Sequence, residues 1–176
     1  MQRMRTGAGF YGLVFIAGFI TFALHEGGHW LAALLLGHEP FFGLNSAGTR
    51  DAVSAADHAV ISAAGPAVTI VQALIALALV QARSSAAAWV FLFWAAFMRF
   101  MATVISLFNP NDEARISEWL GWGPWALPLM VTAALFVLLA IGSRRLRVSW
   151  KTLALTWVAA SVAVSAVVGL DVLIPG

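Results

Sequence analysis

The sequence predicts an all-α integral membrane protein with about five transmembrane helices. Of its 176 residues, 61% are hydrophobic and 10% are charged, whereas soluble proteins have about 45–50% apolar and about 25% charged residues. Five apolar runs are separated by short polar segments, and each is long enough to cross a bilayer at about 20 residues per span. This composition excludes a soluble domain, a disordered chain and a fibrous repeat. The chain has no cysteine, which excludes a disulfide framework and a thiolate metal site.

Each apolar run defines one predicted helix. The five predicted spans cover roughly 9–36, 58–82, 86–108, 124–142 and 152–172. Between the first two spans, the polar and glycine-containing segment 38–57 predicts a loop or a short hairpin. Pro110 ends the third helix, because proline disfavours helical geometry in the residue before it, and 113–120 predicts one or two helical turns. Since no repeat and no linker divides the chain, residues 1–176 form one predicted transmembrane domain.

The distribution of Lys and Arg predicts the orientation in the membrane. An N-terminus on the inner side would place on that side Arg3, Arg5, Arg83, Arg144, Arg145, Arg147 and Lys151. The outer side would hold Arg50 and Arg115, and inner loops of membrane proteins carry the excess of basic residues. The charges therefore favour an N-terminus on the inner side. Arg99 would lie within the third span, where we expect it to pair with an acid such as Asp57 or Glu113 rather than to stabilise an oxyanion.

One ionisable motif interrupts the first apolar run: His25-Glu26-Gly27-Gly28-His29. Histidines four residues apart lie on one face of a helix, about one turn apart, and two imidazoles at that spacing can bind one zinc ion. Glu26 beside them can act as a general base toward water. Ionisable side chains in a membrane helix are costly and usually belong to a functional site. The alternative is that these residues pack between helices in their neutral forms.

A zinc site of this kind needs a third protein ligand and leaves a fourth position for water. The candidates are Asp112, Glu113, His38, His58, Asp57 and Glu39. The first and third spans end on the same side, and irregular backbone at membrane depth is tolerated where protein or a water-filled cavity surrounds it. The segment 109–112 can therefore fold inward. We predict Asp112 as the third ligand, with Glu113 as the second choice. The alternative for Asp112 is a surface acid that caps the following helix.

Three segments resemble the site-2 protease family of intramembrane zinc metalloproteases. The run from His25 to Ala33 resembles the family's zinc-binding helix. Ser62–Ala67 resembles its alanine-glycine-proline segment, and Asn109–Asp112 is similar to its asparagine-proline-aspartate-glycine segment, whose aspartate is a zinc ligand. The resemblance spans roughly residues 10–118 and implies a three-helix metalloprotease core there. Two further spans at about 124–172 lie outside it.

The sequence departs from the family's pattern at two places. Asn111 stands between the proline and Asp112, and Glu113 replaces the glycine, so the resemblance leaves the choice between the two acids open. Thr69 stands where the family often carries an asparagine, three residues after the proline, so a hydroxyl would replace an amide toward the substrate. The family's site usually opens toward the cytosol, whereas the charges favour a site nearer the outer face. Both orientations stay open.

Together these features predict an intramembrane zinc metalloendopeptidase. It would hydrolyse peptide bonds in or near transmembrane helices of other membrane proteins, with one Zn²⁺ per chain held by His25, His29 and Asp112 and with Glu26 as the catalytic residue. The stretch 38–57 would offer an extended edge to the substrate. We expect a multi-pass protein of a bacterial or archaeal cell membrane, with a substrate helix and the lipid bilayer as partners and no nucleic acid. Its oligomeric state stays open.

Two other functions are compatible with the same residues. The first is a catalytically inactive relative of the family that binds zinc or partner helices. The second is a metal-ion transporter, which would have ion ligands near the midplane of the bilayer and a pair of interrupted helices. The off-centre motif and the single proline break argue against a transporter.

Overall fold

The computed structural model describes residue 4 and residues 6–173. In that part of the chain it contains six helices and one two-stranded sheet. In chain order these are α1 (Ala8–Leu35), β1 (Pro40–Phe42), β2 (Ala47–Thr49), α2 (Ala55–Arg83), α3 (Ala86–Ile105), α4 (Asp112–Trp119), α5 (Ala126–Leu146) and α6 (Trp150–Leu173). All except α4 are long and apolar enough to cross a membrane. The predicted all-α class with five long apolar helices is confirmed, and the fold is consistent with a multi-pass membrane protein.

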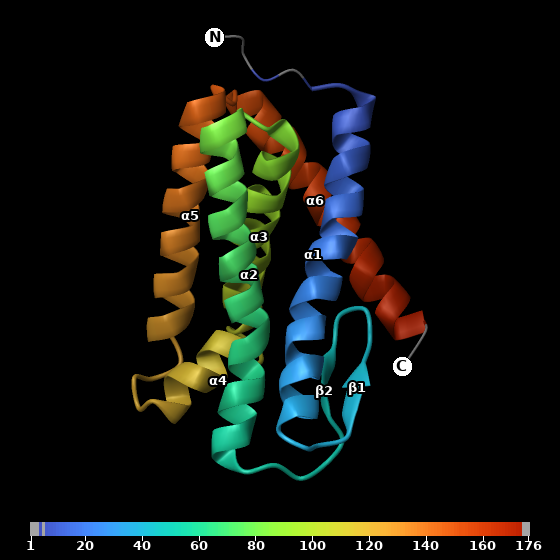
Figure 1. Cartoon of the computed structure of the whole chain (residues 1–176), viewed down its shortest axis with the longest axis vertical. Helices are drawn as coiled ribbons and strands as arrows, with labels where there is room; N and C mark the ends of the chain where they lie inside the picture. Colours follow the sequence, from blue (N-terminus) through green and yellow to red (C-terminus); the bar gives the residue numbers. More distant parts are fainter. Residues whose placement is uncertain (1–3, 5, 174–176) are drawn as a thin grey trace.

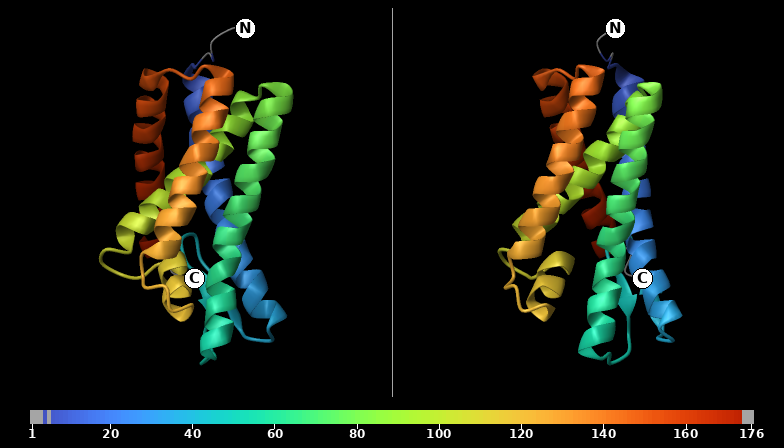
Figure 2. Two further views of the ribbon diagram at one scale, coloured as in Figure 1. Left: turned by 90° about the vertical axis from the view of Figure 1, so that its left-hand side faces the viewer. Right: turned by 60° about the vertical axis from the view of Figure 1, so that its left-hand side comes forward.

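The long helices alternate in direction and form one bundle, with α3 at its centre (Figure 1). In the most apolar stretch of α3, 67% of the residues are buried, against 33% or less in the other four long helices. α3 packs against α1, α2 and α5, whereas α6 packs mainly on α1. Figure 2 shows that α4 and the β-hairpin lie at the end of the bundle opposite the N-terminus.

Polar side chains satisfy free backbone groups where several helices begin. Ser54 and Ser85 precede α2 and α3, and each side chain accepts a hydrogen bond from the backbone N–H three residues later. The side chain of Asn111 accepts one from the N–H of Asp112 at the start of α4. Gly37 follows α1 with a φ of 82°, a conformation that glycine adopts without strain. Ser54, Asn111 and Gly37 thus define helix ends near the hairpin and α4, and Ser85 defines the start of α3 at the opposite end of the bundle.

The connecting segments agree with the sequence in outline, and three helix ends differ by three or more residues, one of them the start of α2 at Ala55 rather than at 58. The segment between α1 and α2 forms the short hairpin, one of the two predicted forms, and α4 supplies the predicted helical turns. α3 ends at Ile105 rather than at 108, because residues 106–108 form a turn ahead of the proline. α5 continues past the predicted end at 142 to Leu146, and the arginines of this last turn interact favourably with the helix dipole.

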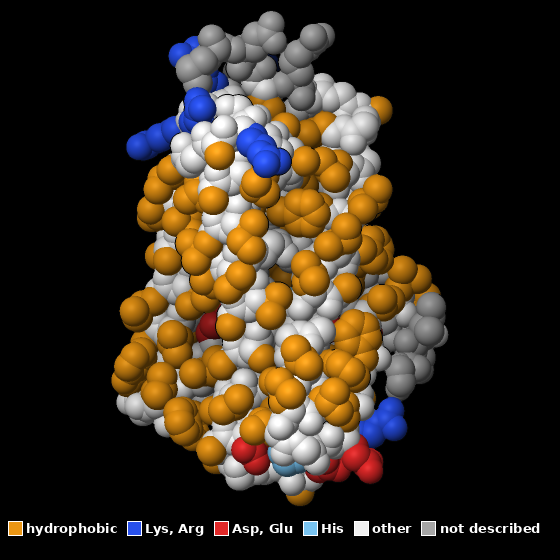
Figure 3. Space-filling model, viewed as in Figure 1, with side chains coloured by type: hydrophobic (Ala, Val, Ile, Leu, Met, Phe, Trp, Pro, Cys, Tyr) orange, Lys and Arg blue, Asp and Glu red, His pale blue; other side chains and the backbone are white. Residues whose placement is uncertain are grey.

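Charged side chains gather at the two ends of the bundle, with apolar side chains between them on the face in Figure 3. The end formed by the α2–α3 and α5–α6 connections carries Arg83, Arg144, Arg145, Arg147 and Lys151. The opposite end carries the hairpin and α4 with most of the acids. Arg3 and Arg5 lie outside the described residues. The orientation with the basic end inside stays a prediction from the charge rule.

Candidate metal centre

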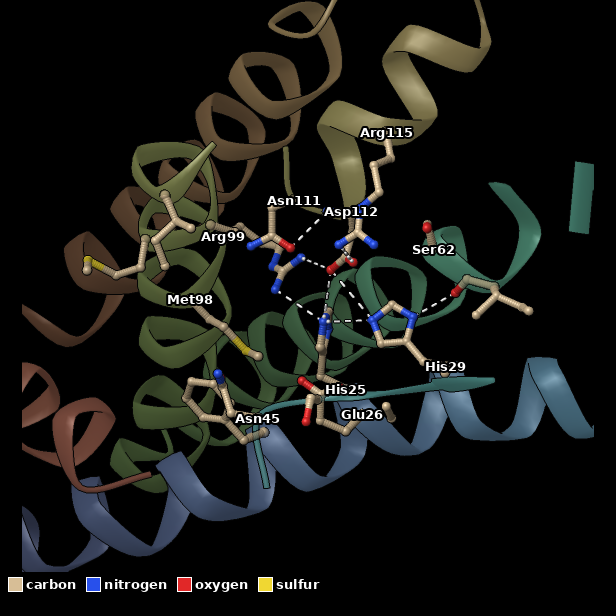
Figure 4. A pocket seen from close by; sticks show the side chains of 18 of the residues that line it. His25, Glu26, His29, Asn45, Ser62, Met98, Arg99, Asn111, Asp112 and Arg115 are labelled. Carbon is tan, nitrogen blue, oxygen red and sulfur yellow. Dashed lines mark hydrogen bonds and ion pairs between the residues drawn. The ribbon is translucent and has the colours of Figure 1, made fainter. Parts of the chain in front are cut away.

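Two histidines of α1 and one aspartate of α4 meet inside the bundle (Figure 4). The Nε2 atom of His25 lies 3.1 Å from Nε2 of His29 and 3.2 Å from Oδ2 of Asp112. The Nε2 atom of His29 lies 3.5 Å from the same carboxylate oxygen, and all three residues are buried. A tetrahedral ion with bonds of about 2.0 Å separates its ligand atoms by about 3.3 Å. The three side chains could therefore hold one metal ion.

The second ring nitrogen of each histidine determines which nitrogen faces this centre. Nδ1 of His29 lies 2.6 Å from the backbone oxygen of Ile61, which can only accept a hydrogen bond. Nδ1 of His25 lies 3.0 Å from the hydroxyl of Thr69, which donates its own hydrogen to the backbone oxygen of Gly65. Each ring therefore donates from Nδ1, and in the neutral form its Nε2 carries a lone pair.

Three atoms with lone pairs thus face one another, namely the two Nε2 atoms and Oδ2 of Asp112. Among the described residues, Nε2 of His29 has only His25 and Asp112 within contact, and neither offers it a proton. Arg99 can donate to the other two atoms, but Nε2 of His29 is left as a buried acceptor without a donor among these three atoms, which is costly. A cation among them removes this cost, and two imidazole nitrogens with one carboxylate oxygen are a donor set found in catalytic zinc sites. The residues fit a bound zinc ion.

Helix α2 approaches the centre closely because glycines stand at the contact. A Cβ atom on Gly65 would overlap with the rings of His25 and His29. A Cβ atom on Gly28 would lie 2.9 Å from the backbone oxygen of Ala64, closer than side chains normally approach. This contact gives the alanine-glycine-proline segment a physical role, which is to leave room for both imidazoles.

Glu26 lies next to the three side chains and beside a cavity of about 560 Å³. It is 6% exposed, and Figure 4 shows its carboxylate apart from the network of contacts around Asp112. Residues from α1, α2, α3, α4, α6 and the hairpin line this cavity. A general base needs access to the proton that it takes, and the position of Glu26 provides that access.

Arg99 of α3 contacts the same centre from the other side. Its Nη1 donates to Oδ2 of Asp112 at 3.3 Å and to the two carboxylate oxygens of Glu113 at 3.1 and 3.2 Å. Its Nη2 lies 3.3 Å from Nε2 of His25. Asp112 thus accepts a hydrogen bond from a buried guanidinium, and an opposite charge at this distance stabilises the ionised carboxylate. Asp112 therefore carries a negative charge.

The structure brings Asp112, and none of the other five candidates, to the two histidines. Glu113 pairs with Arg99 instead, as one of the two expected pairs. Four candidates lie outside the group, near the hairpin and the start of α2: His38, Glu39, Asp57 and His58. The expected alternative pair of Arg99 with Asp57 is absent, because Asp57 lies 3.3 Å from His38.

The sequence did not predict the contacts that the two histidines make through Nδ1. Thr69 was expected to replace an amide toward the substrate, but its hydroxyl faces His25. The position of Thr69, one turn after Gly65 in an apolar helix, was the signal that could have indicated a partner for a buried histidine. The backbone oxygen of Ile61, which receives His29, carried no signal, because every residue has such an oxygen.

Comparison with known proteins finds no matching family model, no matching curated protein and no matching solved structure. The site-2 protease family therefore stays a resemblance carried by three segments of the sequence. What this centre can do follows from its own geometry and chemistry.

Proposed function

We propose that this protein is an intramembrane zinc metalloprotease that hydrolyses peptide bonds in or near transmembrane helices of other membrane proteins. One observation carries the proposal. His25, His29 and Asp112 surround one point inside a bundle of apolar helices, with Glu26 at the adjoining cavity. Ionisable groups inside membrane segments are expensive, and the usual reason for them is a functional site.

His25, His29 and Asp112 would hold the zinc ion. When bound, zinc supplies Lewis acidity that activates water and polarises a peptide carbonyl. The chain orients the donor atoms in advance, because Thr69 and the backbone of Ile61 fix both imidazoles through Nδ1. Partners of this kind are typical of metal-binding histidines, and they make the ring nitrogen a better ligand.

Glu26 would transfer the proton during hydrolysis. Its carboxylate accepts a proton from the attacking water as the new carbon–oxygen bond forms, and then delivers that proton to the nitrogen of the leaving amine as the peptide bond breaks. Glu26 directly follows His25 on α1, so one helix positions both the ligand and the base.

The hairpin offers the substrate an open strand edge at the cavity. Ala47, Gly48 and Thr49 of β2 line that cavity. Backbone hydrogen bonds join Gly43 to Ser46 and Arg50 to Glu39. Because hydrogen-bonded pairs alternate along an antiparallel ladder, the backbone groups of Ala47 and Thr49 point away from β1. An extended substrate segment can pair with this edge through its backbone. A helical substrate must unwind first, since its own helical hydrogen bonds occupy its backbone N–H and C=O groups. Because the pairing uses the backbone, it tolerates many side-chain sequences.

Cleavage of membrane-protein substrates tests the proposal. Single-span test proteins with helix-weakening residues at different depths are co-expressed with wild type, with Glu26→Gln and with Glu118→Gln. Glu118 is an exposed acid of α4 and serves as a matched control. We expect wild type and Glu118→Gln to produce the same two fragments, by intact mass, and Glu26→Gln to produce at least about 100-fold less.

Zinc content decides how a loss of cleavage is interpreted. Glu26 is not one of the three proposed zinc ligands, so the Glu26→Gln variant should keep its zinc while it loses proteolytic activity. Cleavage by Glu26→Gln at the wild-type rate would contradict the role of Glu26. A zinc-loaded wild type that cuts none of the test proteins would contradict the proteolytic function.

A further inference from the structure

A buried arginine stands beside the proposed metal ligands, which is an unusual neighbour for a cation site. Arg99 is 2% exposed. Its guanidinium touches both Asp112 and His25. A divalent ion bound to these side chains would meet a positive charge a short distance away, where the low dielectric of the interior strengthens the repulsion.

Glu113 is the second buried acid at this place. It is 4% exposed, and both of its carboxylate oxygens accept from Nη1 of Arg99, at 3.1 and 3.2 Å. Arg99 thus donates from one nitrogen to the first two residues of α4, Asp112 and Glu113. The arginine anchors the start of α4 to α3 and directs Oδ2 of Asp112 toward the histidines.

The charges explain why two acids are present. If Asp112 were the only acid, its charge would be neutralised by Arg99, and a metal ion would find two neutral imidazoles and no net anion. In the ion pair of Arg99 with Glu113 the two charges cancel, and the charge of Asp112 remains for the metal. Arg115 also lies 3.5 Å from Oδ1 of Asp112, but its side chain is 39% exposed, so water screens its charge and the buried Arg99–Glu113 pair dominates the local balance.

We propose that Glu113 is a positioning residue that neutralises Arg99, so that the guanidinium can hold Asp112 in place without weakening the affinity of the centre for a divalent cation. This inference rests on the metal site of the proposed function and not on proteolysis. It assigns a role to the acid that occupies the position of a glycine in the resembling family.

Zinc affinity of the full-length protein in detergent tests the role, measured by competition with a chelator of known affinity. Glu113→Gln leaves Arg99 without its counter-charge, and we expect the affinity to fall by about 10–100-fold. Arg99→Met removes the excess charge with an unbranched side chain. The double variant Arg99→Met, Glu113→Gln should therefore bind zinc at least about tenfold more tightly than Glu113→Gln alone.

The controls distinguish a role of Glu113 in charge balance from a purely structural role in holding α4 against α3. Glu118→Gln removes the same charge from an exposed position of the same helix and should keep the wild-type affinity. Circular dichroism shows whether Glu113→Gln purifies as folded protein. If it does not, two double variants are compared: Arg99→Met, Glu113→Gln, which has no charge at either position, and Arg99→Lys, Glu113→Gln, which keeps the positive charge at position 99. The variant with Lys at position 99 should then bind zinc about 10–100-fold more weakly than the variant with Met there.

Each outcome bears on a distinct conclusion. Recovery of affinity in the neutral double variant supports the proposal, because a mere brace would be damaged further by a second substitution. No recovery, or an equal loss in Glu118→Gln, overturns it. A wild type that binds zinc but cleaves no substrate contradicts the proposed function and leaves this inference standing. A wild type that binds no zinc overturns both.

Discussion

Two halves of the same bundle are held together by different physical means. The aromatic half, toward the basic end, consists of large rings on α3 that pack against rings of α1 and against Trp157 of α6. Trp89, Phe93 and Phe97 form a continuous row, with ring centroids 5.7 and 5.8 Å apart. Gly18 lies so close to Trp94 that a Cβ atom would come within 2.5 Å of its ring.

The metal half, toward the hairpin, joins α1 and α3 to α2 and α4 through polar side chains. Here His25, Thr69, Arg99, Asp112 and Glu113 form one connected set of hydrogen bonds and ion pairs. The residues of this set come from four different helices. Each buried group depends on a partner at one distance and one direction, which is not true of the stacked rings.

The difference shows which property each half controls. In a membrane, helices associate through close packing and interhelical hydrogen bonds. Packing in the aromatic half sets the distance and angle between α1 and α3, and its loss should appear as lower stability. Directional contacts in the metal half position the donor atoms, and their loss should appear as lower metal affinity. The two readouts can be measured separately on the same variants.

Gly65→Ala should have the largest effect on metal binding. Its new methyl group would occupy the space of the two imidazoles, so both rings must move away from Asp112. We expect zinc to be lost from the purified protein, as measured by elemental mass spectrometry. Gly27→Ala is the matched control, since a Cβ atom there meets nothing within 4 Å, and it should bind zinc like wild type. Equal zinc contents in the two variants would contradict the geometry of the centre.

Thr69→Val should weaken metal binding without abolishing it. Valine has nearly the shape of threonine but cannot accept the hydrogen bond from Nδ1 of His25. Removal of such an outer partner typically lowers metal affinity by about 10–100-fold. Chelator competition measures the change, and Thr69→Ser, which keeps the hydroxyl, should stay close to wild type. An unchanged affinity in Thr69→Val would show that this contact does not orient the ring.

Gly18→Ala should leave metal binding unchanged and reduce stability. The methyl group would collide with the ring of Trp94, whose Nε1 is held by the backbone oxygen of Val14 at 2.7 Å. Overpacking of this kind costs about 1–3 kcal/mol, measurable as a lower free energy of unfolding in mixed micelles. A large fall in zinc affinity with unchanged stability would mean that the two halves are not separable.

The sequence predicts the parts of this molecule that depend on local order along the chain. Apolar runs fix the long helices, and the four-residue spacing of His25 and His29 fixes their common face. Asp112, which stands 87 positions after His25, could be chosen only by following the directions of the spans. Contacts such as that between His29 and the backbone of Ile61 depend on how closely α1 and α2 cross, and no local pattern encodes that distance.

Metal content tests most directly whether His25, His29 and Asp112 hold a zinc ion. The protein is purified without added chelator, and zinc per chain is measured for wild type and for the double variant His25→Ala, His29→Ala. We predict about one zinc ion per wild-type chain, as a site with two histidines and one carboxylate binds a single ion, and none in the double variant at unchanged helical content. Equal zinc in both proteins, or no zinc in wild type, would contradict the assignment.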